Sequence, residues 1–109
     1  MTENIPQPLE INTAKRMALT FKGLGDPTRV QVLSILLEGE SSVNDLASAI
    51  GISQSALSHQ LALLRNLGFV SSRREGQKVY YRIDDEHIGD LYKRAFEHSH
   101  HLNSEGRLA

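Results

Sequence analysis

A glycine between two short apolar patterns constrains the fold of this chain more than any other feature of its sequence. Apolar residues recur at helical spacing before Gly51 and again after Ser53. They are Val43, Leu46, Ala47 and Ile50, then Leu57, Leu61, Leu64 and Leu67. Glycine permits a tight turn between two helices, and serine is a favoured helix N-cap. The pattern predicts a helix-turn-helix over residues 42–67 whose second helix is anchored by its leucines.

Two more helices are expected before this unit. The first has an apolar face that we expect to pack against the rest of the protein. Its residues are Ile11, Ala14, Met17, Ala18, Phe21 and Leu24. Gly25 ends this helix, Asp26 can cap the next one, and Pro27 occupies its first position. Gly39 ends the second helix.

A hairpin and a last helix follow the helix-turn-helix. Residues 69–73 and 79–83 are rich in β-forming side chains and flank Glu75-Gly76-Gln77, which predicts a hairpin, or wing, over residues 69–83. A helix over residues 85–102 then carries one apolar stripe: Ile88, Leu91, Tyr92, Ala95 and Leu102. The expected fold is mainly α with a small β-hairpin, a winged helix-turn-helix of order α-α-α-α-β-β-α.

Length and composition indicate one small globular domain. The chain has 109 residues, so it buries a modest fraction of its surface and would gain from a partner subunit. We expect the domain over residues 9–102, between a flexible arm (1–8) and a flexible tail (103–109). No apolar run approaches the roughly 20 residues of a membrane span, and the start lacks a signal-peptide core, so a cytoplasmic protein is expected.

Polar and basic side chains on the helix-turn-helix and the wing suit DNA. The net charge is only −1, but basic residues concentrate between positions 73 and 82, and hydroxyls and amides occupy the outward face of the second helix. The predicted DNA contacts are Ser53, Gln54, Ser55, Ser58, His59, Gln60, Arg65, Arg73, Arg74, Gln77 and Lys78. The alternatives are an ordinary solvated face and, for His59, a packing role. The basic hairpin directly downstream favours DNA binding, because its cations would neutralise phosphates beside the groove.

Three stretches of the chain carry a resemblance to a known family. They are Gly25-Asp26-Pro27-Thr28-Arg29, then Ser53-Gln54-Ser55 with Ser58-His59-Gln60-Leu61, and Arg74-Glu75-Gly76-Gln77 before Val79-Tyr80-Tyr81. Over nearly its whole length the chain resembles the ArsR/SmtB family of bacterial metal-responsive repressors. The resemblance implies a homodimer that represses in its metal-free form and leaves operator DNA when the effector binds.

Three histidines share one face of the last helix. His87 and His98 are 11 positions apart and His98 and His101 are 3 apart, so all three project within about 60° of one another, whereas His100 falls off that face. Eleven residues of helix span about 16 Å, but zinc ligands lie about 2 Å from the ion. One helix therefore cannot close a metal site, whereas two antiparallel copies can.

Twofold symmetry would bring Asp85 and His87 of one subunit to His98 and His101 of its mate, with the apolar stripe as the seam. These four residues match the site on the last helix of the zinc-sensing branch of the family, so the resemblance implies that they are the metal ligands. In an ideal helix, a residue two positions before His87 would point away from it. Asp85 must therefore lie at or before the helix start to share a site with His87. Asp84 is the rival oxygen donor, and a solvated histidine-rich helix end is the alternative without a site.

The absence of cysteine separates this chain from another branch of the family. The thiophilic branch places cysteines in the segment corresponding to residues 41–48, which argues against arsenic, cadmium or lead sensing through thiolates here. One carboxylate and three imidazoles suit tetrahedral Zn²⁺ and are acceptable to Co²⁺. Nickel sensors recruit extra donors on the same helix, and His100 could be one, so Ni²⁺ stays open.

The expected function is a metal-responsive transcriptional repressor whose partners are operator DNA, a second copy of the chain and a metal ion, with no membrane. One rival is a regulator of the same fold that answers to another effector or to none. The other rival is a zinc enzyme, which is disfavoured because four protein donors leave no open coordination position.

Overall fold

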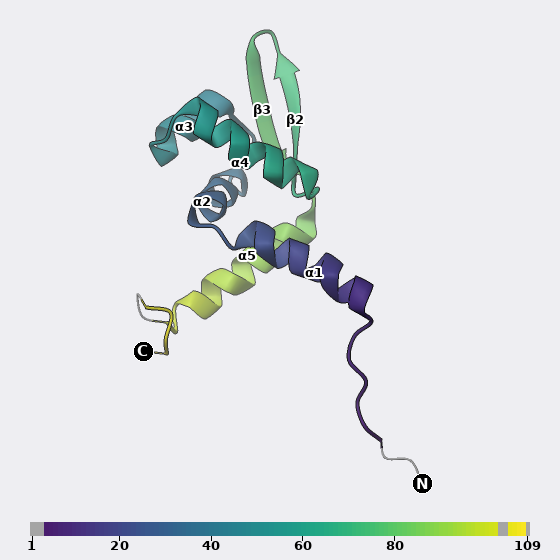
Figure 1. Ribbon diagram of the computed structural model, residues 1–109. Coiled ribbons are helices and arrows are strands. Elements are labelled where there is room, and N and C mark those ends of the chain that lie inside the picture. The colour runs from purple at the N-terminus through teal and green to yellow at the C-terminus, as the bar shows by residue number, and fades with distance from the viewer. Residues whose placement is uncertain (1–3, 103–104, 109) are drawn as a thin grey trace.

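The computed structural model describes residues 4–102 and 105–108 of the chain. Within these residues the chain forms five helices and three short strands (Figure 1). Their bounds are α1 Ile11–Leu24, α2 Pro27–Leu36, β1 Ser41–Ser42, α3 Val43–Ile50, α4 Gln54–Asn66, β2 Val70–Glu75, β3 Lys78–Ile83 and α5 Glu86–Ser99. The arrangement confirms the predicted winged helix-turn-helix, in which α3 and α4 are the helical pair and β2 and β3 form the wing.

The wing belongs to a three-stranded antiparallel sheet of order β1-β3-β2. The sequence did not predict β1, whose two residues, Ser41 and Ser42, pair with β3 directly before α3 begins. Strands β2 and β3 pair over their whole length and leave only Gly76 and Gln77 in the turn. Gly76 has a φ of 62°, a conformation that favours glycine.

Local capping fixes the helix-turn-helix as the sequence predicted. The carboxylate of Asp26 accepts a hydrogen bond from the backbone N–H of Arg29 at the start of α2, and the Ser53 hydroxyl accepts one from Ala56 at the start of α4. Helix α3 ends at Ile50, and its C-cap Gly51, with a left-handed φ of 84°, makes the turn toward α4.

The core lies where α2, α3 and α4 pack against the sheet and the first turn of α5. Its buried members are Val32, Leu33, Leu36, Leu46, Ala47, Leu57, Leu61, Leu64, Phe69, Val70, Tyr81 and Ile88. Leu57, Leu61 and Leu64 of α4 are each 0% exposed. Burial of these three leucines turns the opposite face of α4 toward solvent.

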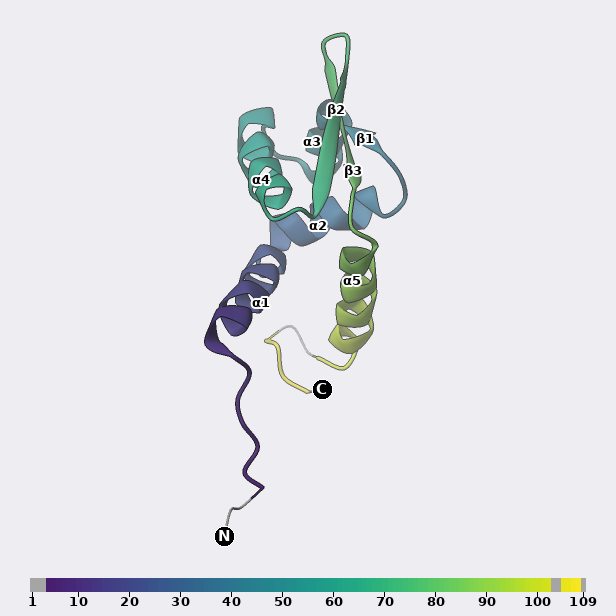
Figure 2. The same ribbon diagram turned by 90° about the vertical axis from the view of Figure 1, so that its right-hand side faces the viewer.

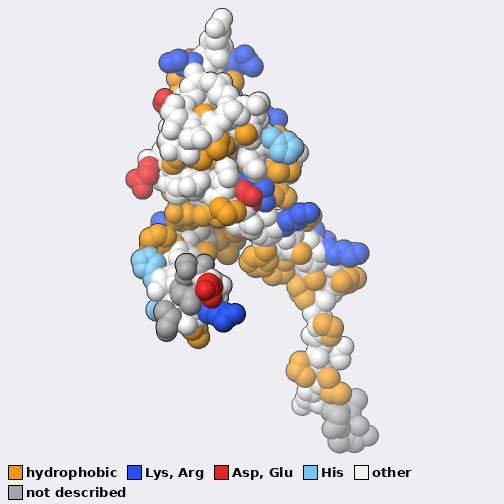
Figure 3. Space-filling view, turned by 60° about the vertical axis from the view of Figure 1, so that its left-hand side comes forward, with side chains coloured by type: hydrophobic (Ala, Val, Ile, Leu, Met, Phe, Trp, Pro, Cys, Tyr) orange, Lys and Arg blue, Asp and Glu red, His pale blue; other side chains and the backbone are white. Residues whose placement is uncertain are grey.

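Helices α1 and α5 leave this core as two legs on the side away from the wing tip (Figures 1 and 2). The molecule is elongated, with extents of 68 × 34 × 21 Å. Of the apolar face of α1, which was predicted to pack, Leu24 lies against the core, but Ile11 is 62% exposed and Phe21 is 58% exposed. Figure 3 shows hydrophobic side chains gathered along this leg. None of the helices in the described part of the chain has the length and hydrophobicity of a membrane span.

Helix α5 is shorter than the predicted span of residues 85–102. It begins at Glu86 and ends at Ser99, and a turn containing His101 follows. Leu102 then forms an isolated backbone bridge with Leu108. Residues 1–3 of the predicted arm and residues 103, 104 and 109 of the predicted tail lie outside the described residues, so the flexibility of both segments stays a prediction.

Arg29 of α2 joins α1 to α4. Its guanidinium donates to the carbonyl oxygens of Lys22 (2.9 Å) and Gly23 (2.8 Å) at the end of α1, and to Oε1 of Gln60 on α4 (2.9 Å). Gly23 also lies close to the end of α4, because a Cβ built there would stand 2.5 Å from Cδ1 of Leu67. The end of α1 is therefore held to α4 by hydrogen bonds and by close packing.

Replacing Arg29 by Met should lower the free energy of unfolding by about 1–3 kcal/mol, because three acceptors lose their donor. Urea unfolding monitored by circular dichroism measures this loss. Arg16→Met is the matched control, since the Arg16 guanidinium bonds to Thr13 within α1. Equal midpoints for the two variants would contradict the assigned role of Arg29.

Candidate DNA-binding surface and metal donors

The outward face of α4 is polar and exposed, as its buried leucines require. Ser55, Ser58, His59 and Arg65 are all exposed on it. The Ser53 hydroxyl caps the helix and also lies 3.2 Å from the hydroxyl of Ser55. This face carries hydroxyl, imidazole and guanidinium groups, which can meet phosphates and base edges.

Gln60 differs from the sequence prediction, which placed it on the outward face. It is half-buried, and its side-chain oxygen accepts the hydrogen bond from Arg29. Gln60 therefore faces α2 and is not part of the exposed polar face of α4.

Gln54, the first residue of α4, is oriented by a partner that the sequence analysis missed. Its side-chain nitrogen donates to Oδ1 of Asn44 on α3. Both residues line a groove between the helix-turn-helix and the wing, which Ser42, Val43, Ser58, Gln77, Lys78, Val79 and Tyr81 complete. With one amide hydrogen bonded to Asn44, Gln54 retains a second N–H and an acceptor oxygen for a ligand in this groove.

Strand alternation separates the cations of the wing. Arg74 pairs across the sheet with Val79, on the same face as the pair Ser72 and Tyr81, whose tyrosine enters the core. On that face the Ser72 hydroxyl lies 3.5 Å from the guanidinium of Arg65 on α4. The Arg74 face is thus the one that looks toward α4.

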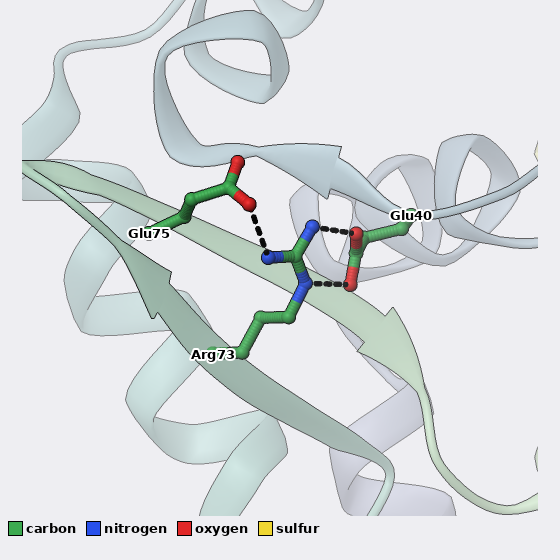
Figure 4. A network of polar contacts seen from close by, with 3 residues as sticks. All are labelled: Glu40, Arg73 and Glu75. Carbon is green, nitrogen blue, oxygen red and sulfur yellow. Dashed lines mark hydrogen bonds and ion pairs between the residues drawn. The ribbon is translucent and has the colours of Figure 1, made fainter.

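Arg73 lies on the other face of β2, where carboxylates hold it (Figure 4). Its guanidinium donates two hydrogen bonds to Glu40, at 2.7 and 2.9 Å, and approaches Glu75 at 3.4 Å. It also stands 4.6 Å from the centre of the Tyr80 ring. The sequence predicted that Arg73 contacts phosphate, but in the structure its charge is already paired, so Arg73 also leaves the proposed DNA surface.

The bond between Arg73 and Glu40 shifts both groups toward their charged forms. Hydrogen bonding from Arg73 is the main cause that lowers the pKa of Glu40, and the same bond raises the pKa of Arg73. Because the lowered pKa keeps Glu40 ionised, the pair stays charged throughout the neutral range.

Asp85 and His87 lie together at the start of α5. Asp85 is the N-cap, with an extended backbone (φ −123°, ψ 112°), which satisfies the condition that it precede the helix. Its Oδ1 accepts from the backbone N–H of His87 and lies 2.9 Å from Nδ1 of the same residue. Asp84, the rival donor, lies 3.8 Å from the guanidinium of Arg82.

His98 lies in the last turn of α5 and His101 in the turn that follows it, with their ring centroids 6.5 Å apart. The His100 ring instead contacts Phe96, with centroids 4.6 Å apart. In the described part of the chain, no three histidine or carboxylate side chains of one copy gather closely enough to hold a metal ion. A metal site built from both ends of α5 therefore needs donors from a second copy.

The apolar stripe of α5 is divided between two environments. Ile88 is buried in the core of its own chain, so it is not available for the predicted seam between subunits. Farther along, Phe96 is 53% exposed, and its ring stacks with Tyr92 at 6.3 Å. Phe96 is absent from the predicted stripe, although its position four residues after Tyr92 places both rings on one side of the helix.

Sequence comparisons connect the chain to bacterial regulators. The profile described as "Bacterial regulatory protein, arsR family" matches residues 26–72. The "HTH-type transcriptional regulator NmtR" of Mycobacterium tuberculosis is 44% identical over 96 residues, which are 88% of this chain and 80% of that protein. The "Cadmium resistance transcriptional regulatory protein CadC homolog" of Staphylococcus aureus is 46% identical over 91 residues, or 83% and 75% of the two chains.

The fold has close counterparts among solved structures. One is the homodimeric winged helix-turn-helix DNA-binding domain Mb0332 from Mycobacterium bovis, described as a possible ArsR-family transcriptional regulator. It superposes with a TM-score of 0.79 at 26% identity and covers 98% of this chain and 99% of its own. These named relatives are regulators rather than enzymes, which agrees with the expectation that the chain is not an enzyme.

Proposed function

The chain belongs to the ArsR family of bacterial regulatory proteins, and from this premise we propose that it is a cytoplasmic metal-responsive repressor that binds operator DNA as a homodimer. The observation that carries the proposal is the exposed polar face of α4, anchored from behind by three fully buried leucines and flanked by the wing. A helix of this kind enters the major groove and reads base edges from its first turns.

Two sets of side chains would divide the work of binding DNA. The bases and nearby phosphates would be contacted by the helix-turn-helix, through Ser53, Gln54, Ser55, Ser58, His59 and Arg65. Arg74, Gln77 and Lys78 of the wing meet the backbone beside the groove. The shared orientation of Arg74 and α4 supports this division, because one stretch of duplex can contact both.

Exposed apolar side chains on both legs support the homodimer. Phe21 on α1 and Phe96 on α5 are each more than half exposed, and large apolar groups in such positions mark interaction surfaces. The related domain from Mycobacterium bovis is described as homodimeric. We propose that the legs of two copies pack together and thereby set the separation of the two α4 helices, close to the roughly 34 Å between successive major grooves.

The proposed effector is zinc, held by Asp85 and His87 of one subunit and by His98 and His101 of the other. The donor set fits zinc, since it offers one carboxylate and three imidazoles, and the N-cap position turns Asp85 toward His87. A named relative is associated with cadmium resistance, but this chain has no cysteine and so no thiolate ligands. When bound, zinc would supply a crosslink between the two α5 helices.

Linkage sets the requirement for release from DNA. The free dimer must bind the ion more tightly than the DNA-bound dimer, and DNA must then weaken metal binding by the same factor. Metal binding by the four donors favours one arrangement of the two α5 helices in the dimer. DNA binding favours the separation of the two α4 helices that matches successive major grooves of the operator. The two preferences compete because the same subunits carry both sets of residues.

Replacing Arg74 and Lys78 by Gln should weaken DNA binding and flatten its salt dependence. Each lost phosphate contact removes about 0.9 from the slope of log affinity against log salt. Fluorescence anisotropy measures this slope on duplexes that the parent protein enriches from a randomised pool. The control is Arg16→Gln on α1, which should keep the slope of the parent, and an unchanged slope for the wing variant would contradict the proposed contacts.

Phe96→Lys should raise the dimer dissociation constant, because a charge would be buried at the seam. Sedimentation velocity over a dilution series measures the change. Phe96→Leu preserves the apolar character and should stay dimeric. A Lys variant that dimerises as tightly as the Leu variant would exclude Phe96 from the interface.

His98→Ala should leave operator binding intact and abolish its reversal by zinc. The measurement is anisotropy of a preformed protein–DNA complex titrated with zinc, then with cobalt and nickel. His100→Ala is the matched control: it should keep the zinc response, and it loses a nickel response if His100 is an added nickel ligand. Release of the His98 variant by zinc at the parent concentration would rule out this ligand set.

A further inference from the structure

Arg73 forms a bidentate ion pair with Glu40, outside the proposed metal site. Two guanidinium nitrogens meet the two oxygens of Glu40, a bidentate geometry that fixes orientation as well as distance (Figure 4). Glu75 and the Tyr80 ring restrain the same guanidinium from two other directions. The Arg73 side chain is thus held in one place although it is half-exposed.

This ion pair connects two parts of the fold that are 33 residues apart in sequence. Glu40 directly precedes β1 and stands two residues before Ser42, which caps α3. Arg73 lies in the middle of β2. Strand β1 already pairs with β3 over two residues. The ion pair adds a second connection, from the start of the helix-turn-helix to β2, the strand of the wing that does not pair with β1.

Fixing Arg73 also fixes the direction of its neighbour. Adjacent residues of a strand point to opposite faces, so Arg74 must point toward the α4 side when Arg73 is held on the Glu40 side. Lys78 pairs with Glu75 on the Arg73 face, but next to the turn it also lines the groove beside Gln54 of α4. A wing that twists or bends away from β1 would carry both Arg74 and Lys78 away from α4.

We propose that Arg73 and Glu40 are positioning residues for DNA binding, which hold the wing where Arg74 and Lys78 meet the DNA backbone together with α4. This inference rests on the proposed DNA-binding function. It assigns no contact with DNA to Arg73 itself, and it gives Glu40, an acidic residue, a favourable effect on binding to a polyanion.

The sign of the effect at Glu40 distinguishes positioning from plain electrostatics. Glu40→Gln removes a negative charge, so long-range electrostatics would strengthen DNA binding, and a released Arg73 would strengthen it further. Positioning predicts the opposite, because the wing loses its tether. Exposed ion pairs contribute little to global stability, so the effect should appear in DNA binding rather than in the melting temperature.

The experiment measures anisotropy on duplexes enriched by the parent protein, over a range of salt. Glu40→Gln should bind about threefold to fivefold more weakly, with a flatter salt slope, as though it had lost cations. In an Arg74→Gln, Lys78→Gln background it should have no further effect, because the contacts that the bridge positions are already gone. Arg73→Gln should behave like Glu40→Gln.

Two controls match these variants. Glu38→Gln removes an exposed carboxylate two residues away and should bind as tightly as the parent or more tightly. Arg82→Gln removes an exposed cation from the same face of the sheet as Arg73, where it lies 3.8 Å from Asp84, and it should weaken binding less than Arg73→Gln. Thermal melting by circular dichroism checks that every variant is folded.

Separate outcomes overturn the inference and the function on which it rests. If Glu40→Gln binds as tightly as the parent or more tightly, or weakens binding equally in the Arg74→Gln, Lys78→Gln background, Arg73 and Glu40 do not position the wing. If the parent enriches no sequence from the randomised pool, the proposed operator-binding function is wrong as well.

Discussion

Burial of three leucines on α4 decides how the rest of the molecule can be used. Leu57, Leu61 and Leu64 are fully removed from solvent, and burying a leucine side chain contributes about 1.5–3 kcal/mol. Rotating α4 to bury its polar face instead would forfeit that contribution and leave hydroxyl and imidazole groups without solvent. The helix therefore has one stable orientation. Its polar face is presented as part of a rigid surface.

The features that the sequence predicted well are local ones. Periodicity identifies the leucines, and Asp26, Ser53 and Gly51 act within a turn of their own position, so their roles follow from residue type and spacing. The placement of Asp85 ahead of α5 followed from the same kind of reasoning, because side chains two positions apart in a helix, such as those of Asp85 and His87, point in nearly opposite directions. Strand β1 escaped prediction because two residues carry no alternating pattern.

Two of the predicted DNA-contact residues have hydrogen-bond partners far away in the sequence. Gln60 meets Arg29 from 31 residues before it, and Arg73 meets Glu40 across 33 residues. Residue type and spacing show that a polar side chain lies on an outward face. A partner distant in sequence decides whether that side chain is available to bind DNA. The apolar face of α1 presents the same limit, because periodicity identifies a shared face without identifying what covers it.

The way in which α1 and α5 are attached to the core explains how a change in their packing against a second copy could alter the position of α4. Arg29 and the packing at Gly23 fix the end of α1 to α4, while Ile88 fixes the start of α5 into the core to which the α4 leucines also belong. Packed cores resist small deformations, so a change in how two copies set their legs must move each core as a unit. The α4 helix moves with its core because its three leucines belong to it. In the proposed dimer, a constraint on the far ends of the legs would therefore change the separation between the two α4 helices.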